Sequence, residues 1–287
     1  MTNPTLTRHL RDVIDGVDVI LSDIWGVVHN GLKAWPDACA ALTEFRRRGG
    51  KVVLITNAPR PADSVQRMLR RLNVADDVYD GIVSSGDLTR GYVDEHRTQR
   101  VFHIGPERDH SLFEGFGVAF GDVEDADYVV CSGLFDDETE TAETYRATLT
   151  RARTRGLFFV CANPDIVVER GEKLIFCAGA LAELYATLGG EVLFAGKPHP
   201  PIYQRALALA AEAGAASVSP ERVLAIGDSV RTDLEGANGN GFRCLFVTSG
   251  IHAGELGERA NPDAASVTKL FKGASKPPFA VTPTLVW

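Results

Sequence analysis

Three short apolar runs, each leading into a polar side chain, constrain the fold more than any other feature of this sequence. They are 17–21 before Asp23, 51–55 before Thr56 and Asn57, and 223–227 before Asp228. Such runs, rich in Val, Ile and Leu, are typical of parallel strands buried on both faces. Helical segments separate the runs, and a strand–helix–strand unit is right-handed and parallel almost without exception. The sequence therefore predicts an α/β fold with a Rossmann-like parallel-sheet core and these polar residues on one rim.

Helices are expected where start and stop signals frame an amphipathic segment. One runs from Pro36 to the basic triplet before Gly49, and others end near Leu72 and Ala213. Weaker signals assign three further segments: 5–15 as a lead-in helix, 81–86 as a strand and turn, and 284–287 as an edge of the sheet. These three assignments depend on local pattern alone.

The length and the order of the segments predict two domains. At 287 residues the chain reaches the size at which single hydrophobic cores stop growing. A fresh α/β alternation lies between the second and third runs, with strands expected at 101–105, 128–131 and 157–161 and a helix at 139–153. The prediction is a core formed by 1–83 and 192–287, with 84–191 as an inserted α/β cap domain.

Composition narrows the class of partner and compartment. The formal net charge of −8 and the pI near 5.4 argue against nucleic-acid binding, which needs a basic surface. The five cysteines are an odd number without a Cys-x-x-Cys pair, which favours buried thiols in a reducing cytosol. No apolar stretch approaches the roughly 18 residues of a membrane span. A cytoplasmic protein without membrane or nucleic-acid partners is expected.

The polar residues on the rim suit phosphoryl transfer to a carboxylate. A carboxylate approaches a phosphate dianion only if the negative charge is offset, and Mg²⁺ bound to Asp23 and Asp228 would do this. Asp233 follows five residues after Asp228 and is expected to hold a metal-bound water or support a metal ligand. The result would be an aspartyl phosphate on Asp23.

Three further residues are candidates for holding the phosphate. Lys197 offers a compact positive charge, while Thr56 and Asn57 offer hydrogen-bond donors. Each residue also has an ordinary structural interpretation, in which Lys197 is an exposed lysine at a helix start and Asp233 an acid at a helix N-terminus. Asp23 alone could equally cap the turn before Gly26. The combination favours chemistry, whereas each residue by itself does not.

These motifs resemble the haloacid dehalogenase superfamily. The match consists of Asp23-Ile24-Trp25-Gly26, Ile55-Thr56-Asn57, Lys197 and Gly227-Asp228-Ser229-x-x-x-Asp233, in that order. The long insert resembles the class IIA group, which includes the 4-nitrophenyl phosphatase-like, phosphoglycolate, pyridoxal phosphate and NagD-like phosphatases. The resemblance implies Mg²⁺, a cap that shapes the pocket, and a substrate-facing loop at Asn163 and Asp165, for which an Asn-Pro turn closing a strand is the alternative. A homodimer is also plausible by resemblance.

The sequence departs from the family pattern at Trp25. The family's phosphatases have an aspartate there that protonates the leaving oxygen and then activates water, and losing such a group costs about 10²- to 10⁴-fold in rate. The metal ligand that the family takes from this position is a backbone carbonyl, which Trp25 retains. An aromatic residue here also resembles the superfamily's metal-free dehalogenases.

Three functions follow from this departure. The first is a Mg²⁺-dependent phosphatase for a small, sugar phosphate-like monoester, whose leaving group needs little protonation or takes its proton from His29 or Asp165. The second is a carbon–halogen hydrolase that uses Asp23 without metal. The third is a catalytically weakened or inactive protein that binds phosphate and Mg²⁺. Because Asp228 and Asp233 have no role in a metal-free enzyme, phosphate hydrolysis ranks above dehalogenation.

Overall fold

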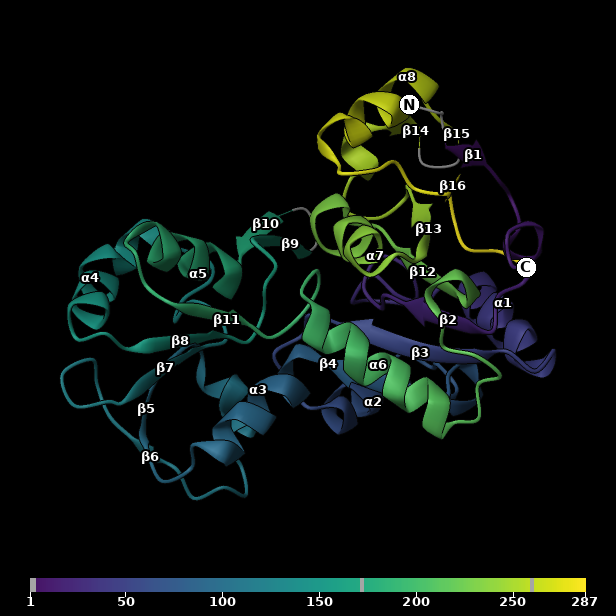
Figure 1. Cartoon of the computed structure of the whole chain (residues 1–287). Helices are drawn as coiled ribbons and strands as arrows, with labels where there is room; N and C mark the ends of the chain where they lie inside the picture. Colours follow the sequence, from purple (N-terminus) through teal and green to yellow (C-terminus); the bar gives the residue numbers. More distant parts are fainter. Residues whose placement is uncertain (1–3, 171–172, 259–260) are drawn as a thin grey trace. The chain divides into compact units, whose positions relative to one another are not determined.

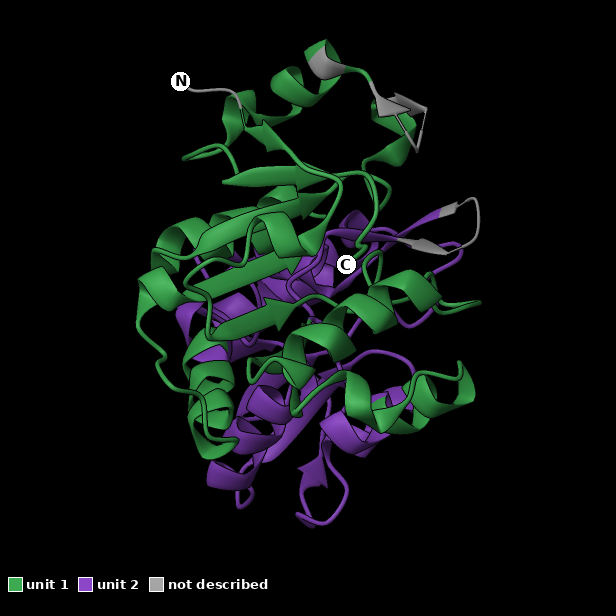
Figure 2. Cartoon of the chain, turned by 90° about the vertical axis from the view of Figure 1, so that its right-hand side faces the viewer, with its two compact units in different colours: residues 1–56, 66–83, 203–287 green, residues 57–65, 84–202 purple. Residues whose placement is uncertain are grey.

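The computed structural model describes residues 4–170, 173–258 and 261–287, and it divides into two compact units (Figure 2). The first unit comprises 1–56, 66–83 and 203–287, and the second comprises 57–65 and 84–202. The expected insert, 84–191, lies within the second unit, which also includes 57–65 and 192–202. The role of this unit as a cap stays a prediction.

The first unit is built on a seven-stranded sheet of order β1-β16-β13-β12-β2-β3-β4 (Figure 1). Its strands are β1 Thr5–Leu6, β16 Ala280–Thr282, β13 Arg243–Val247, β12 Val223–Gly227, β2 Val19–Ser22, β3 Lys51–Thr56 and β4 Gly81–Ser84. The pairings from β1 through β3 are parallel. Every residue of β2 and β12 is buried, as expected of central strands covered on both faces. The predicted parallel α/β core is confirmed.

The helices named in the first unit are α1 Pro36–Arg47, α2 Ala62–Arg71, α6 Pro200–Glu212, α7 Glu235–Asn240 and α8 Ala264–Leu270, of which α2 and α6 begin in segments assigned to the second unit. Helix α1 begins at a proline and buries Ala38, Ala41, Leu42 and Phe45. Near its end, Arg46 donates two hydrogen bonds to Asp80, from Nε at 2.8 Å and from Nη2 at 2.7 Å. Asp80 also accepts from the backbone N of Val52, so one carboxylate ties α1 to β3.

Two predictions at the chain termini are wrong. The segment 5–15 is not a helix: Thr5 and Leu6 form edge strand β1, and only Leu10–Asp12 forms a 3-10 turn. The C-terminal strand is Ala280–Thr282, which lies between β1 and β13, and 284–287 is not a strand. Strands from opposite ends of the sequence pair with each other, with Thr5 opposite Ala280. The pattern of residues within a short segment does not indicate so distant a partner.

The second unit has its own parallel sheet of order β11-β8-β7-β5-β6, with helices on both faces. The strands are β5 Arg100–Ile104, β6 Ala119–Phe120, β7 Tyr128–Cys131, β8 Phe158–Cys161 and β11 Val192–Phe194. One hydrophobic cluster joins the sheet to α4 Arg146–Thr154 and α5 Ala178–Thr187, and a second joins it to α3 Ser85–Glu95. A hairpin of β9 Val167–Arg170 and β10 Lys173–Phe176 stands apart from this sheet.

Helix α3 replaces the turn expected after residue 84, and a capping box explains its start. The Ser84 hydroxyl accepts from the backbone N of Asp87, and the Asp87 carboxylate accepts from the backbone N of Ser84. The helix expected at 139–153 begins later, as a 3-10 turn at Ala142–Tyr145 that continues into α4.

Two expectations from composition can be compared with the described residues. All five cysteines are free thiols, four of them buried. Among the helices of the described ranges, none has the length and apolar character that crossing a membrane requires.

Candidate functional site

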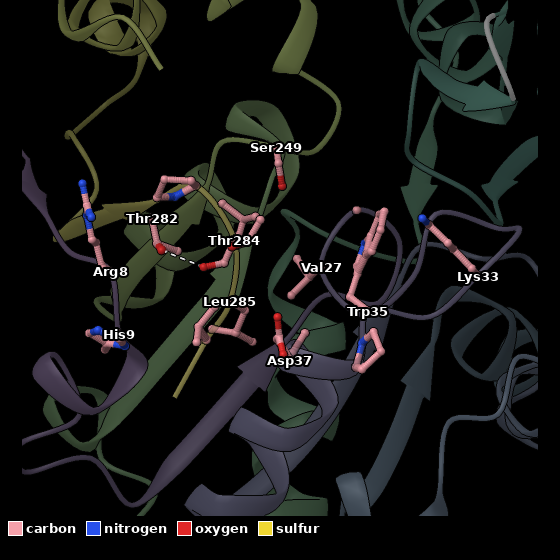
Figure 3. Close-up of a pocket in the computed structure, with 16 residues that line it drawn as sticks. Arg8, His9, Val27, Lys33, Trp35, Asp37, Ser249, Thr282, Thr284 and Leu285 are labelled. Atoms are coloured by element: carbon pink, nitrogen blue, oxygen red, sulfur yellow. Dashed lines mark hydrogen bonds between the residues drawn. The ribbon is translucent and has the colours of Figure 1, made fainter. Parts of the chain in front are cut away.

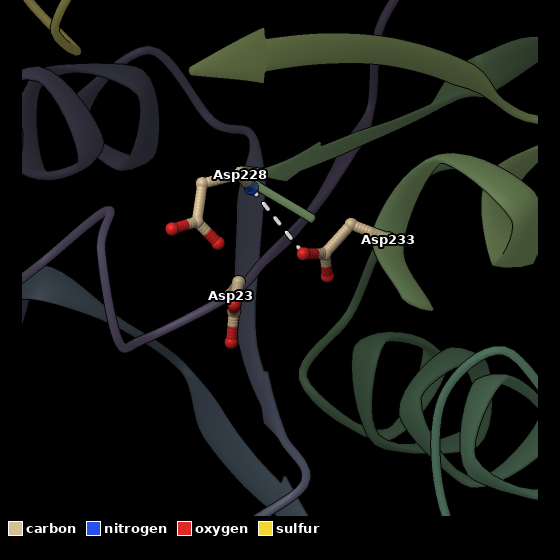
Figure 4. Close-up of side chains that lie close together, drawn as sticks. All are labelled: Asp23, Asp228 and Asp233. Atoms are coloured by element: carbon tan, nitrogen blue, oxygen red, sulfur yellow. Dashed lines mark hydrogen bonds between the residues drawn. The ribbon is translucent and has the colours of Figure 1, made fainter. Parts of the chain in front are cut away.

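Three acidic side chains meet at the carboxyl ends of the central strands of the first unit. Asp23 follows β2, Asp228 follows β12, and Asp233 lies in a π-helical turn, Val230–Leu234. One carboxylate oxygen from each lies within 4.8 Å of the others, and the residues are only 7%, 5% and 3% exposed (Figure 4). Three buried carboxylates repel one another unless a cation lies between them, so this oxygen-only set fits a hard divalent cation. The predicted grouping is found.

Asp23 is held rigidly at the end of its strand. Its backbone N donates to Ile226 O at 2.8 Å, which extends the pairing of β2 with β12 by one residue. Its carboxylate Oδ1 accepts from the backbone N of Ile24 at 2.7 Å. The Ser22 hydroxyl donates to the carbonyl of Asp23. Both the backbone and one carboxylate oxygen of Asp23 are therefore fixed by neighbours in the loop.

Glycines make room for the other two acids. A Cβ atom at Gly26 would lie 2.0 Å from Asp228 Oδ2, and one at Gly250 would lie 1.9 Å from the same oxygen. That oxygen also accepts from the backbone N of Ile251 at 2.8 Å. A Cβ at Gly227 would lie 2.1 Å from Cγ of Asp233. Sequence reasoning missed the role of Gly250 and Ile251, which follow β13 and carry no reactive side chain that would have marked them.

The π-helical turn explains how Asp233 reaches Asp228. The backbone N of Leu234 bonds Ser229 O, five residues earlier, which widens the turn. The Asp233 carboxylate Oδ2 then accepts from the backbone N of Ser229 at 3.1 Å and of Asp228 at 3.3 Å. Asp233 thereby fixes the backbone that carries Asp228, and it contributes a carboxylate oxygen to the acidic set (Figure 4).

Trp25 and His29 form a pair beside this cluster. The Trp25 side chain is 41% exposed, and its ring meets the His29 ring edge-on at a centroid distance of 5.2 Å. His29 is fully buried, and its Nδ1 accepts from the backbone N of Gly31 at 2.9 Å. The proton of the neutral ring is therefore on Nε2, which has no hydrogen-bond partner among the described residues. Burial lowers the pKa of His29 to about 4.

A second polar group forms within the second unit, around Asn57. Asn57 Nδ2 donates to Asp165 Oδ1 at 3.0 Å and to the carbonyl of Lys197 at 3.1 Å, and Asn57 Oδ1 accepts from the backbone N of Lys197 at 2.8 Å. Asn163 Oδ1 accepts from the backbone N of Asp165 at 3.1 Å. Lys197 is only 2% exposed. The structure therefore brings four predicted site residues of this unit together, while Thr56 ends β3 in the first unit, one residue before Asn57.

The first unit also contains a pocket of about 760 Å³ next to the loop that carries Trp25 (Figure 3). Gly26 and Val27 contribute from that loop, Trp35 and Asp37 from the start of α1, and 282–286 from the C-terminal segment. Lys33 lies with its Nζ 5.0 Å from the centre of the Trp35 ring. The three acids do not line this pocket, and sequence reasoning did not predict it.

Comparison with known proteins places the chain in a family. Residues 20–119 match the model of haloacid dehalogenase-like hydrolases, and residues 194–272 match a HAD-hydrolase-like model. A hydrolase of the haloacid dehalogenase-like family from Brucella suis 1330 has a structure with a TM-score of 0.84 and 44% identity, covering 98% of this chain and 100% of that one.

Two of the similar sequences and structures are named for an activity. The D-glycerol 3-phosphate phosphatase of Mycobacterium tuberculosis is 29% identical over 259 residues, which cover 85% of this chain and 66% of that enzyme, slightly under two thirds. A structure of glycerol phosphate phosphatase from Mycobacterium tuberculosis in complex with calcium has a TM-score of 0.62 and 26% identity, covering 83% of this chain and 68% of that one. With its motifs, its insert and its 44% identical relative, the chain belongs to the haloacid dehalogenase-like hydrolases, in the class IIA group.

Proposed function

We propose that this chain is a phosphoric monoester hydrolase that acts on small phosphate esters of the sugar phosphate kind. The observation that carries the proposal is the set of three buried carboxylates at the ends of β2 and β12. Named phosphatases among its relatives support the reaction class, with glycerol 3-phosphate as a substrate of one of them. The same arrangement has an evident use in phosphoryl transfer, because it combines a fixed carboxylate nucleophile with a place for a cation.

Mg²⁺ is the proposed cation, held by Asp23, Asp228 and the backbone carbonyl of Trp25, with Asp233 in support. The donor set is all oxygen and the carboxylates lie within 4.8 Å of one another, which fits a small hard cation. Such an ion offsets the negative charge that would otherwise keep the carboxylate and the phosphate apart. Asp233, through Ser229 and Asp228, would keep Asp228 in place.

The remaining catalytic and binding roles are assigned to side chains of the protein. Asp23 attacks phosphorus with the oxygen that does not accept from Ile24, forming an aspartyl phosphate that water then hydrolyses. The Thr56 hydroxyl and the Lys197 ammonium are assigned to the phosphate oxygens. Both hydrogens of the Asn57 amide are donated to Asp165 and Lys197, so we assign the Asn57 side chain to positioning Lys197. Asn163 and Asp165 remain candidates for contacting the rest of the substrate.

The alternatives make different use of the same residues. A metal-free carbon–halogen hydrolase would gain nothing from two further carboxylates beside Asp23, and their mutual repulsion would be a cost. A protein that binds phosphate without turnover would keep the acids, and the half-exposed Trp25 is the feature that favours it. Turnover decides between this last alternative and the phosphatase.

The test is phosphate release from a panel of small phosphate esters, measured with Mg²⁺, with chelator, and with haloacids as competing substrates. The proposal expects Mg²⁺-dependent release from at least one ester and no halide release. Chloride release that persists in chelator would replace the phosphatase with the dehalogenase. Phosphate binding without release, seen by calorimetry, would leave the binding protein.

We further propose a cytoplasmic, reducing location and a homodimer. Burial raises the pKa of the Cys131, Cys161, Cys177 and Cys244 thiols, so these side chains are protonated and unreactive at neutral pH. The excess of acidic residues supports the absence of a nucleic-acid partner. Light scattering on the purified chain tests the dimer, and a thiol count before and after oxidation tests the disulfide-free state.

A further inference from the structure

We propose that Trp25 restricts this enzyme to phosphate esters and acyl phosphates whose leaving groups are acidic, such as phenols, enols and carboxylic acids, because neither Trp25 nor His29 can give a proton to the leaving oxygen. The inference rests on the proposed phosphatase reaction, and within that reaction it favours acidic leaving groups over the alkoxide leaving groups of ordinary sugar phosphates. It begins from the position of Trp25, which lies two residues after Asp23 on the loop that carries the acidic set, with 41% of its surface exposed.

Neither side chain of the Trp25–His29 pair can deliver a proton. The indole ring of Trp25 has only a weakly acidic N–H, which donates hydrogen bonds but does not ionise in water. His29 is fully buried, its Nδ1 accepts from the backbone N of Gly31, and its Nε2 lies beneath the surface. A leaving oxygen outside the protein surface therefore cannot reach either nitrogen of His29.

The geometry keeps the indole in this position. A Cβ at Gly31 would lie 2.4 Å from the nearest atom of the indole, so another residue at position 31 would displace the ring. The His29 ring contacts the indole edge-on, with the ring centroids 5.2 Å apart. The indole therefore packs on Gly31 and His29, and Trp25 stays 41% exposed two residues after the nucleophile.

The neighbouring acids are already engaged. Asp228 Oδ2 accepts from the backbone N of Ile251, and Asp233 Oδ2 accepts from the backbone N of Ser229. Both carboxylates are also assigned to the proposed cation, and a carboxylate that holds a cation does not serve as a proton donor. Neither group is available as an acid.

The charge left on the leaving oxygen then determines the substrate class. The bond between phosphorus and the ester oxygen breaks, its electron pair leaves with that oxygen as RO⁻, and a bond forms between phosphorus and an oxygen of Asp23. No proton is transferred in this step. An alkoxide is a poor leaving group without protonation, whereas a phenolate, enolate or carboxylate leaves as a stable anion. Water then attacks phosphorus, the Asp23 carboxylate leaves, and the proton of the water passes to solvent.

The experiment compares kcat/KM for 4-nitrophenyl phosphate, phenyl phosphate and ethyl phosphate, with Mg²⁺, in the native chain, Trp25→Asp and Trp25→Asn. Because kcat/KM covers only steps up to formation of the aspartyl phosphate, slow hydrolysis of that intermediate does not obscure the result. Asn has nearly the size of Asp but no acidic proton, so this pair of variants separates acid catalysis from the space made by removing the indole.

The native chain is expected to lose kcat/KM steeply as the leaving group becomes less acidic. Trp25→Asp should raise kcat/KM for ethyl phosphate by about 10²- to 10⁴-fold, the usual effect of a positioned acid, and change 4-nitrophenyl phosphate much less. Trp25→Asn should raise neither.

Three results would overturn the proposal. Similar native kcat/KM values for ethyl and 4-nitrophenyl phosphate would mean that a proton donor exists. If kcat/KM then falls more steeply with decreasing acidity of the leaving group in Asp165→Asn than in the native chain, Asp165 is that donor. An equal gain in Trp25→Asn would mean that Trp25 acts by its size. Release from none of the esters, with halide release or phosphate binding instead, would remove the proposed function itself. If Trp25→Asp does not fold, the native and Asp165→Asn slopes still decide the question.

Discussion

The two units of this protein contain the same kind of parallel sheet, yet the carboxyl ends of their strands carry opposite chemistry. In the first unit, β2 and β12 lead into Asp23 and Asp228, and Asp233 joins them. In the second unit, β7 leads into Ser132, β8 into Asn163 and β11 toward Lys197. One rim concentrates buried negative charge, whereas the other combines hydroxyl, amide and ammonium groups with the carboxylate of Asp165.

The same type of sheet thus supports both a site for a cation and a nucleophile and a site for substrate recognition. Buried parallel strands fix the backbone at their ends, and the residue placed there decides what the end can bind. Three carboxylates suit a cation and a nucleophile, and neutral or cationic groups suit recognition of an anionic, hydroxyl-rich substrate. Substitutions in each unit test this division of roles.

The same substitution on the two rims should have very different effects. Asp23→Asn removes the nucleophile and should lower kcat/KM for phosphate release by about 10⁴-fold or more. Asp165→Asn keeps the hydrogen-bonding shape of a residue assigned to substrate contact, and should raise KM by about 10-fold or less. Steady-state kinetics on one ester measures both. Equal losses in the two variants would contradict the division.

Acid should weaken both units through one buried histidine in each. Burial lowers the pKa of His29 in the first unit and of His103 in the second from 6.5 to about 4. The unfolded chain therefore binds these protons at a higher pH than the folded chain does, so stability is lost as pH falls from about 6.5 to 4. Each shift corresponds to roughly 3 kcal/mol at the lower end.

Urea unfolding in chelator, with a probe for each unit, measures this loss. His29→Asn and His103→Gln should each flatten the pH dependence of the free energy of unfolding over this window. A pH dependence unchanged in both variants would mean that other groups cause the acid sensitivity.

Asn57 should stabilise the second unit through its side-chain hydrogen bonds. The amide is 3% exposed, and it bonds both Asp165 and the backbone of Lys197. Asn57→Ala removes these three hydrogen bonds, two of them to buried backbone groups of Lys197, at a cost of about 1–3 kcal/mol. Asn238→Ala, which removes one exposed bond to Lys276 O, is the matched control and should cost less than about 0.5 kcal/mol. Chemical denaturation of the two variants tests the difference.

Gly250 should be required for the metal site without being required for the fold. A Cβ there would lie 1.9 Å from Asp228 Oδ2, whereas a Cβ at Gly254 would meet no atom within 4 Å. Gly250→Ala is expected to weaken Mg²⁺ affinity by about 10-fold, by displacing a carboxylate ligand. Gly254→Ala should leave the affinity unchanged. Calorimetric titration with Mg²⁺ measures both, and equal affinities would show that Asp228 does not bind the metal.

The first rim was predictable from sequence because its geometry follows from local pattern. Each apolar run marks a buried strand, and parallel strands end on the same side, so Asp23 and Asp228 were expected on one rim, while the pairing of β2 with β12 makes them neighbours. Asp233 was expected to join them because it lies five residues after Asp228 in the sequence.

The rest depended on contacts between distant parts of the chain. The bond between Asn57 and Asp165 joins residues 108 positions apart, and β1 pairs with β16 across nearly the whole sequence. Neither leaves a local pattern. Helix α3 is a different kind of failure, because Ser84 and Asp87 have the capping-box spacing, a local signal that the prediction of a turn at 84–86 did not use.

The most direct test of the central claim is to identify the residue that carries the phosphoryl group. The native chain would be mixed with 4-nitrophenyl phosphate and Mg²⁺, quenched in acid, digested and analysed by mass spectrometry. An aspartyl-phosphate mechanism predicts one phosphoryl group on the peptide that contains Asp23. That group should be absent in Asp23→Asn and in chelator. Phosphate release without a phosphorylated Asp23 peptide, or with the label on another residue, would contradict it.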